Sequence, residues 1–333
     1  MEAIPGETMD ERARALHNAS TVVDTHCDTI LSMMRGERRL GERSDKGHLD
    51  LPRLREGGVA AQFFAVYIEP QFKPDRGLQR ALEVIDVLLR ELEAFPDQTE
   101  LALSVADIRR IQSSGRVAAV LAIEGGEGIG GSLANLRVLY RLGLRSLGLV
   151  WNQRNLIADG IAERRTGGGL TTFGVEVVQQ CNELGIVVDV SHLTDPGFWH
   201  VAETCKGPFM ASHSNARAVC DHPRNLMDDQ IKALAAAGGA MGLNFAPAFV
   251  APKDATLADL LDHLDHIVSL VGPDHVGLGS DFDGIGATPK GLEDATAFPR
   301  LTQALVDRGY SDDDIRKFLG ENHLRVLKEV WRG

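Results

Sequence analysis

Short apolar runs alternate with longer amphipathic segments along most of this chain. Residues 117–123 form a continuous apolar run, which is typical of a strand buried on both faces of a parallel sheet. Residues 77–95 carry apolar side chains every three or four positions, which is the period of an amphipathic helix. The same reading predicts strands at residues 21–23, 59–67, 117–123, 145–150, 186–190, 208–212, 240–245 and 275–279. It predicts helices at residues 11–18, 77–95, 106–112, 133–142, 171–184, 196–204, 228–237 and 257–271, and then two more, the last of which begins at Ser311.

This order of elements predicts an α/β fold, specifically a (β/α)8 barrel. Near-continuous apolar strands that alternate with helices indicate a parallel sheet, and eight such units suit a barrel of this length. A doubly wound open sheet is the alternative. The chain contains no internal repeat and no linker that would separate a second domain. We therefore predict a single domain over residues 1–333, in which residues 1–19 form an N-terminal helical extension.

Composition and charge narrow the class of protein. The chain has 333 residues, of which 44% are hydrophobic and 25% charged, and these are ordinary values for a globular protein. Its formal net charge of −12 argues against nucleic-acid binding, which depends on basic surfaces. Residues 1–20 lack the apolar core of a signal peptide, and no apolar run reaches the length of a membrane helix. The four cysteines are far apart, so we expect free thiols in a cytoplasmic protein without a membrane partner.

Polar residues that can bind a metal or carry a proton follow several predicted strands. They are His26 and Asp28 after the first strand, Glu124 after the third, His192 after the fifth, His213 after the sixth and Asp281 after the eighth. In a (β/α)8 barrel these strand ends meet on one face. Imidazole and carboxylate groups suit zinc, and three histidines with two carboxylates exceed the four ligands of one tetrahedral ion. The pattern therefore predicts two metal ions that share Glu124 and activate a water between them.

Proton transfer from that water to a leaving amine requires one further carboxylate. Asp281 and Asp283 both follow the eighth strand, and in an extended chain they would face the same side. We assign the proton transfer to Asp281 because it is closer to the strand end. By contrast, His263 and His266 fall on a predicted helix, and we expect them to form a solvated face rather than a metal site.

Six short motifs give the chain a family resemblance. They are Thr25-His26-Cys27-Asp28, Ile123-Glu124-Gly125-Gly126, Asp189-Val190-Ser191-His192, Ser212-His213-Ser214-Asn215-Ala216, Arg224-Asn225 and Gly279-Ser280-Asp281-Phe282-Asp283-Gly284. In this order, the set resembles the membrane dipeptidase (renal dipeptidase) family of the amidohydrolase superfamily, as a cytoplasmic microbial-type member. The resemblance implies a TIM-like barrel, two Zn²⁺ ions per subunit, and hydrolysis of dipeptides by a metal-bound hydroxide. It also implies tolerance of a D-residue at the C-terminal position of the dipeptide.

The resemblance further implies a role for each matched residue. It assigns His26 and Asp28 to one zinc ion, His192 and His213 to the other, Glu124 to the bridge between them and Asp281 to proton transfer. Arg224 matches the family arginine that binds the free carboxylate of the substrate, and a planar guanidinium suits bidentate carboxylate binding. Because members of the family are often dimers, a homodimer is the oligomeric state that the resemblance suggests.

Two positions depart from the family pattern. Trp151 follows the fourth strand where mammalian members have a histidine, and Glu127 replaces a histidine after the glycine pair of the third-strand motif. An indole N–H can donate one hydrogen bond but cannot titrate, and Asn152 is a substitute donor. We therefore predict that Trp151 and Asn152 bind substrate. These departures leave open a metal-dependent hydrolase of another small amide or lactone, and a third alternative is a non-catalytic, metal-stabilised peptide-binding protein.

Overall fold

The computed structural model describes residues 9–332 of the chain. Its strands are β1 (Val22–Asp24), β2 (Val59–Tyr67), β3 (Thr99–Leu101), β4 (Val117–Glu124), β5 (Leu144–Gly148), β6 (Val187–Asp189), β7 (Met210–Ala211), β8 (Ala240–Leu243) and β9 (Val276–Leu278). Its α-helices are α1 (Glu11–Ala19), α2 (Ile30–Met34), α3 (Leu51–Glu56), α4 (Gly77–Ala94), α5 (Val105–Ser113), α6 (Leu133–Arg141), α7 (Thr172–Leu184), α8 (Asp195–Thr204), α9 (Asp228–Ala236), α10 (Pro247–Val250), α11 (Leu257–Val271), α12 (Phe298–Asp307), α13 (Asp312–Arg316) and α14 (Asn322–Val330). Short 3-10 segments are η1 (Pro70–Phe72), η2 (Gly126–Ile129), η3 (Ile161–Thr166), η4 (Pro273–His275) and η5 (Ala295–Ala297), and the π-helical turn η6 covers Lys317–Glu321. Part of the predicted N-terminal extension, residues 1–8, lies outside the described residues, as does part of the stretch predicted to lack a signal peptide.

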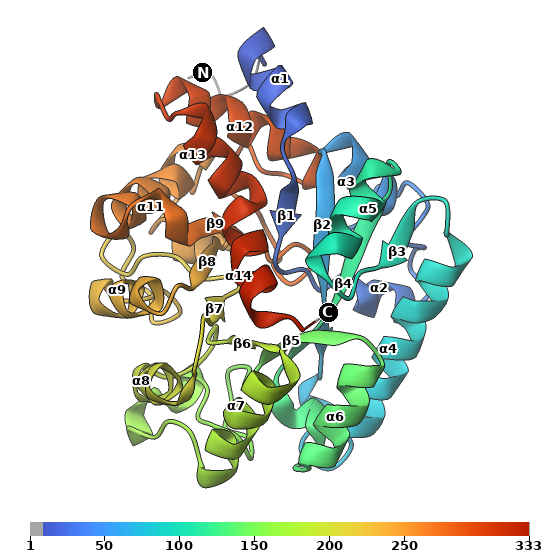
Figure 1. Ribbon diagram of the computed structural model, residues 1–333, viewed down its shortest axis with the longest axis vertical. Helices are drawn as coiled ribbons and strands as arrows, with labels where there is room; N and C mark the ends of the chain where they lie inside the picture. The colour runs from blue at the N-terminus through green and yellow to red at the C-terminus, as the bar shows by residue number, and fades with distance from the viewer. Residues whose placement is uncertain (1–8, 333) are drawn as a thin grey trace.

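The strands close into a parallel barrel that is surrounded by helices (Figure 1). Around the ring the order is β2-β1-β9-β8-β7-β6-β5-β4, and seven residue pairs between β2 and β4, from Ala61–Ala118 to Tyr67–Glu124, complete the circle. This closure confirms the predicted (β/α)8 barrel. The doubly wound alternative is wrong, because an open sheet would leave β2 and β4 as two unpaired edges.

β3 is an additional strand outside the ring, and the sequence analysis did not predict it. Its residues pair with Val117–Ala119 at the start of β4, on the edge that β5 occupies from Leu121 onward. β3 has three residues, and the middle one is charged. So short a segment shows neither an apolar run nor a detectable hydrophobic period. The short helices α2 and α10 were missed for the same reason, since neither contains a full amphipathic repeat.

The last predicted helix begins where expected but is interrupted. Ser311 is its N-cap, and its side chain accepts a hydrogen bond from the backbone N–H of Asp314. The helix is then divided into α13, the π-helical turn η6 and α14, with non-helical backbone angles at Gly320. A side chain at Gly320 would meet the carbonyl oxygen of Thr21, so the kink lets this segment approach the start of β1 closely.

Side chains along each strand alternate between the barrel interior and the surrounding helices. In β4, Val120 and Ala122 belong to the interior cluster, whereas Leu121 and Ile123 pack in the layer that includes the outer helices. Because strand residues two apart share a face, Glu124 continues the interior row. Its carboxylate therefore enters the mouth of the barrel at the end where the strands finish.

Helix α14 closes the opposite end of the barrel. The indole Nε1–H of Trp331 donates to the carbonyl oxygen of Arg145 at the start of β5 (3.1 Å), and its ring stacks on Phe63, with 6.4 Å between ring centroids. Leu324 and Leu327 join the same interior cluster. Figure 1 shows α14 crossing in front of the strands, with the C-terminus beside β4 and β5. Because α14 covers the end where the strands begin, a functional site in the barrel lies at the end where the strands finish.

The expectation that His263 lies on a solvated face is wrong. His263 is fully buried, and its Nδ1 accepts a hydrogen bond from the backbone N–H of Ala216 (3.1 Å). Its Nε2–H donates to the carbonyl oxygen of Val250 (2.9 Å). On α11 it lies beside Leu260 and Leu264 on the buried face, and only the tertiary fold supplies the two backbone partners that satisfy the ring. His266 remains partly exposed and pairs with Asp228.

The sequence also led to predictions about membrane helices and disulfide bonds. No helix among residues 9–332 is long and apolar enough to cross a membrane. The four cysteines, Cys27, Cys181, Cys205 and Cys220, are all free, as the sequence predicts.

Candidate metal centre

The structure brings the predicted metal-binding and proton-transfer residues together at the mouth of the barrel. The six residues come from the C-terminal ends of β1, β4, β6, β7 and β9: His26, Asp28, Glu124, His192, His213 and Asp281. A cavity of about 650 Å³ opens here, and its wall includes Asp28, Glu124, His192 and Asp281. The three histidines, Asp28 and Glu124 are buried.

One group of side chains gathers around the ring of His26. Its Nε2 lies 3.3 Å from Asp28 Oδ2, 3.8 Å from Glu124 Oε1 and 4.0 Å from Asp281 Oδ1. Despite these neighbours, Nε2 is buried and has no hydrogen-bond partner among the described residues. The nitrogen therefore faces three carboxylates at distances that leave room for a shared ligand.

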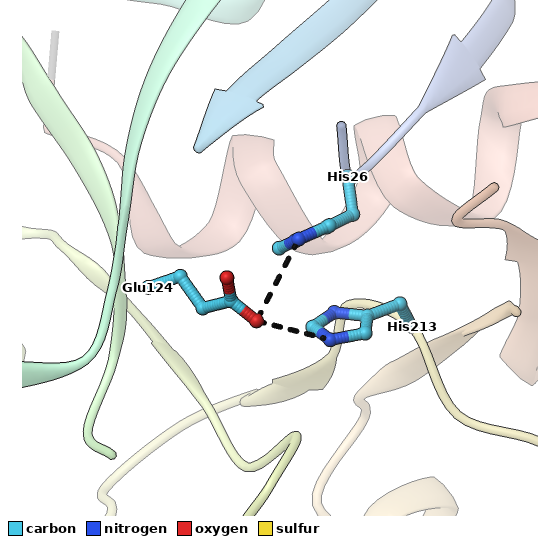
Figure 2. A group of neighbouring side chains, drawn as sticks. All are labelled: His26, Glu124 and His213. Atoms are coloured by element: carbon cyan, nitrogen blue, oxygen red, sulfur yellow. Dashed lines mark ion pairs between the residues drawn. The ribbon is translucent and has the colours of Figure 1, made fainter. Parts of the chain in front are cut away.

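A second group gathers around the same carboxylate of Glu124. Its Oε1 lies 2.9 Å from His192 Nε2 and 3.5 Å from His213 Nε2, and the two ring nitrogens are 2.9 Å apart. Figure 2 shows the Glu124 carboxylate pointing between the rings of His26 and His213. Glu124 Oε1 is thus the atom at which the two groups meet.

Hydrogen bonds behind the second group indicate which ring nitrogens carry protons. His192 Nδ1 lies 2.8 Å from Asn152 Oδ1, an acceptor, so the proton is on Nδ1. Ser212 Oγ donates to the Asp189 carboxylate and therefore accepts from His213 Nδ1–H (2.7 Å). Both Nε2 atoms then present lone pairs to each other. Two lone pairs at 2.9 Å are stable only when a cation lies against them.

The donor set fits divalent metal ions. Two ligands of one tetrahedral zinc ion, each about 2.0 Å from it, are about 3.3 Å apart, and the separations around Glu124 Oε1 fall near this value. Two groups of three side chains that could hold an ion share His26: His26, Glu124 and His213 form one, and His26, Asp28 and Asp281 form the other. The orphaned Nε2 of His26 and the facing nitrogens of His192 and His213 are the atoms that such ions would satisfy.

Burial and mutual repulsion control the charges of the cluster. Burial, with the charges of Glu124 and Asp281, raises the pKa of Asp28 to about 7. Burial, assisted by Glu124, also raises the pKa of Asp281 to about 6. Burial lowers the pKa of His26, but the neighbouring carboxylates outweigh it and bring that pKa to about 10. Burial raises the pKa of Glu124, but His26 and His213 outweigh it and bring that pKa to about 2. Several carboxylates thus surround His26. A metal ion bound there would balance their negative charge, which otherwise favours a proton on His26.

At His192 and His213, unlike at His26, the effect of burial prevails over that of the carboxylates. Burial lowers the pKa of His192 and of His213 well below the usual value, and the nearby Arg224 and His26 act in the same direction. Both imidazoles are therefore neutral, which is the form that binds metals.

Two buried aspartates hold the segments that carry the candidate ligands in place, and the sequence analysis assigned them no role. Asp189, at the end of β6, accepts from the backbone N–H groups of Ser191 (3.0 Å) and Ser212 (2.9 Å). Asp24, at the end of β1, accepts from the backbone N–H (2.7 Å) and hydroxyl (2.6 Å) of Ser280. Each aspartate thus fixes the segment after a neighbouring strand. The signal that could have found them is an Asp that ends a strand shortly before a histidine.

Asp281 and Asp283 occupy different environments, although the sequence placed them on one side of an extended chain. Both have left-handed backbone angles, with φ of 62° and 66°, so the segment turns sharply. Asp281 Oδ2 accepts from Asn244 Nδ2 (3.0 Å), and its other oxygen faces the His26 ring. Asp283 instead accepts from the side chains of Thr29 and Arg38.

Arg224 lies in the cavity wall rather than on the surface. Its side chain is buried, and it donates only long hydrogen bonds to Ser214 Oγ (3.4 Å) and the carbonyl oxygen of His213 (3.2 Å). Its Nε–H has no partner among the described residues. The guanidinium therefore keeps donors available toward the cavity.

Trp151 and Asn152 also line the cavity. The Trp151 ring lies against Tyr67, with 5.1 Å between ring centroids, and 6.1 Å from the His192 ring. The side-chain oxygen of Asn152 already accepts from His192, so its amide nitrogen, a donor, is the group that remains available. Asn152 thus orients a histidine, a contact that the sequence analysis did not predict.

Comparisons with known proteins identify the family of the chain. The sequence model of the membrane dipeptidase family (peptidase family M19) matches residues 10–332. The dipeptidase aclJ of Aspergillus oryzae is 40% identical over 296 residues, which cover 85% of this chain and 70% of that protein.

Two solved structures share the fold across nearly the whole chain. The dipeptidase AC, a metallopeptidase of family M19, is 35% identical, with a TM-score of 0.88 over 94% of this chain and 99% of that one. A metallopeptidase from Rhodobacter sphaeroides, liganded with a phosphinate mimic of the dipeptide L-Ala-D-Ala, is 34% identical, with a TM-score of 0.89 and the same coverage.

Proposed function

The chain belongs to the membrane dipeptidase family of metallopeptidases, and from this premise we propose that it hydrolyses dipeptides at a two-zinc centre. His26 and Asp28 would hold one ion, His192 and His213 the other, and Glu124 would bridge them. The observation that carries the proposal is the position of Glu124 Oε1, 3.8 Å from His26 Nε2 and 2.9 Å from His192 Nε2. When bound, two zinc ions lower the pKa of a water and polarise a carbonyl oxygen.

Asp281 is the residue that we assign to proton transfer. Its Oδ2 is held by the Asn244 side chain, which leaves Oδ1 free to face the cavity and the His26 ring. In this role Oδ1 takes a proton from the attacking water and returns it to the leaving amine, while Asn244 keeps the carboxylate oriented. The same oxygen lies within reach of a metal held by His26 and Asp28, so a ligand role is the alternative to be tested.

Arg224 is the residue that we assign to the free carboxylate of the substrate. The Nε–H of its buried guanidinium has no partner within residues 9–332, and a dipeptide carboxylate would supply an acceptor. Trp151 and Asn152 would complete the substrate-binding wall. Tolerance of a C-terminal D-residue is part of the proposal, because the Rhodobacter sphaeroides relative was solved with a mimic of L-Ala-D-Ala.

A dipeptide library that includes D-residues at the second position tests this function. Metal-free protein prepared with a chelator should be inactive, and stoichiometric zinc should restore turnover, with two ions per chain by elemental analysis. Turnover of small amides or lactones, but of no dipeptide, would instead favour a metal-dependent hydrolase of another substrate class, the alternative suggested by Trp151. Bound zinc without turnover of any of these substrates would identify a non-catalytic binding protein.

A further inference from the structure

Lys73 lies beside both residues that depart from the family pattern, Glu127 and Trp151. Lys73 lies in the segment between β2 and α4, and its Nζ is 3.1 Å from Glu127 Oε1. The same Nζ lies 5.3 Å from the ring centroid of Trp151 and 5.4 Å from that of Tyr67. One ammonium group therefore contacts a carboxylate and two aromatic rings.

This ion pair is shielded from water. The Lys73 side chain is 12% exposed and that of Glu127 only 4%. Buried charges are retained only where they are paired, and an ammonium over an aromatic face gains an additional attraction as it loses water. Asn155 anchors the pair, because its Nδ2 donates to Glu127 Oε2 (3.3 Å) and to the carbonyl oxygen of Leu149 (2.9 Å). The contacts thus lead back to the backbone just before Trp151.

The aromatic rings and the ion pair face two different cavities. Trp151 and Tyr67 line the cavity of about 650 Å³ at the metal centre. Lys73 and Glu127 line a second cavity of about 870 Å³, and Gln153 lies in the wall of both. The two rings, which meet edge to face, therefore form a partition that the ion pair supports from behind.

We propose that Lys73 is a positioning residue that determines specificity: through Glu127 it holds the Trp151–Tyr67 partition, and the partition limits the size of the N-terminal residue of the dipeptide. The inference rests on the proposed function. Around the barrel, β2, which ends at Tyr67, lies opposite β7, which precedes Arg224. A substrate whose C-terminal carboxylate is held by Arg224 therefore directs its N-terminal residue toward the partition.

The variants Lys73→Met and Glu127→Gln test this inference on the zinc-loaded protein. Each removes one charge of the pair with little change in shape. Both should raise kcat/KM for Phe-Ala relative to Ala-Ala by five-fold or more, because the partition can move into the second cavity. Acrylamide quenching of Trp151 fluorescence, taken as the difference from matched Trp151→Phe variants, should increase in both. Lys232→Met, which changes an exposed lysine of α9, should alter neither quantity.

The outcomes separate this inference from the proposed function. Unchanged selectivity and quenching in both variants, in a protein that hydrolyses dipeptides, overturn the inference alone. A loss of zinc that parallels the change in selectivity also overturns it, because Lys73 would then act on the metal centre. If the unsubstituted protein hydrolyses no dipeptide, the proposed function fails, and the quenching measurement still decides whether Lys73 holds Trp151.

Discussion

Ser212 Oγ lies 2.7 Å from Nδ1 of His213, the residue that follows it in the chain. Because the hydroxyl donates its own proton to Asp189, it must accept the proton of the imidazole. The hydroxyl thus determines which nitrogen of His213 is free to bind a metal. Contacts of this kind, behind the ligands themselves, commonly strengthen metal binding.

Ser212→Ala should therefore weaken zinc binding. We expect the affinity of the weaker of the two ions to fall by about 10- to 100-fold, as measured by competition with a chromophoric chelator. Ser280→Ala is the matched control, because Ser280 donates to Asp24 in the same way, and its hydroxyl reaches only the backbone carbonyl oxygen of His26 (3.3 Å) rather than an imidazole nitrogen. Equal losses of zinc affinity in both variants would contradict a specific role for the Ser212–His213 contact.

Asp281→Asn should keep both metal ions and lower kcat by about 10²- to 10⁴-fold, since an amide cannot accept and return a proton. Elemental analysis and steady-state kinetics on the same preparation check the two halves of this prediction. If zinc is lost in proportion to activity, Asp281 is a ligand rather than the proton carrier. Asp283→Asn should reduce stability instead, because Asp283 accepts from Arg38 and Thr29.

Arg224→Ala should raise KM for dipeptides with a free C-terminus. A hydrogen bond to a charged group contributes about 1.5 to 3 kcal/mol, which corresponds to about a 10- to 100-fold increase. Dipeptide amides, which lack the carboxylate, serve as the control, and their kinetic constants should change much less. An unchanged KM for free dipeptides would remove the proposed contact.

His323 should lower the free energy of unfolding of the protein at acidic pH. It is fully buried on α14, and neither ring nitrogen has a hydrogen-bond partner among the described residues. Burial lowers its pKa from 6.5 to about 4. Between pH 6.5 and 4, His323 is protonated in the unfolded chain but neutral in the folded chain. The free energy of unfolding therefore falls as the pH falls, by at most about 1.4 kcal/mol per pH unit.

The variant His323→Gln isolates this contribution. It should flatten the decline in the free energy of unfolding between pH 6.5 and 4, as measured by urea denaturation, whatever its effect at pH 7. A slope that is the same in both proteins would exclude His323 as its source.

The sequence by itself determined the barrel and the residues at its mouth. Parallel strands buried on both faces, such as β4, are encoded in local runs of apolar residues, and their regular alternation with helices leaves few topologies. Because every strand of a (β/α)8 barrel points the same way, a residue at a strand end, such as Glu124 or His213, can be placed on the active face without coordinates.

Tertiary structure alone decided the contacts that join segments remote in sequence. Asp281 and Asp283 are equivalent in an extended chain, and only the left-handed turn separates them into a cavity-facing carboxylate and a partner of Arg38. Likewise, no local pattern relates Lys73 to Trp151, which the loops after β2 and β5 bring together. Apolar periodicity reports how each segment is buried, whereas the pairing of polar groups depends on distances between segments, which exist only in the folded chain.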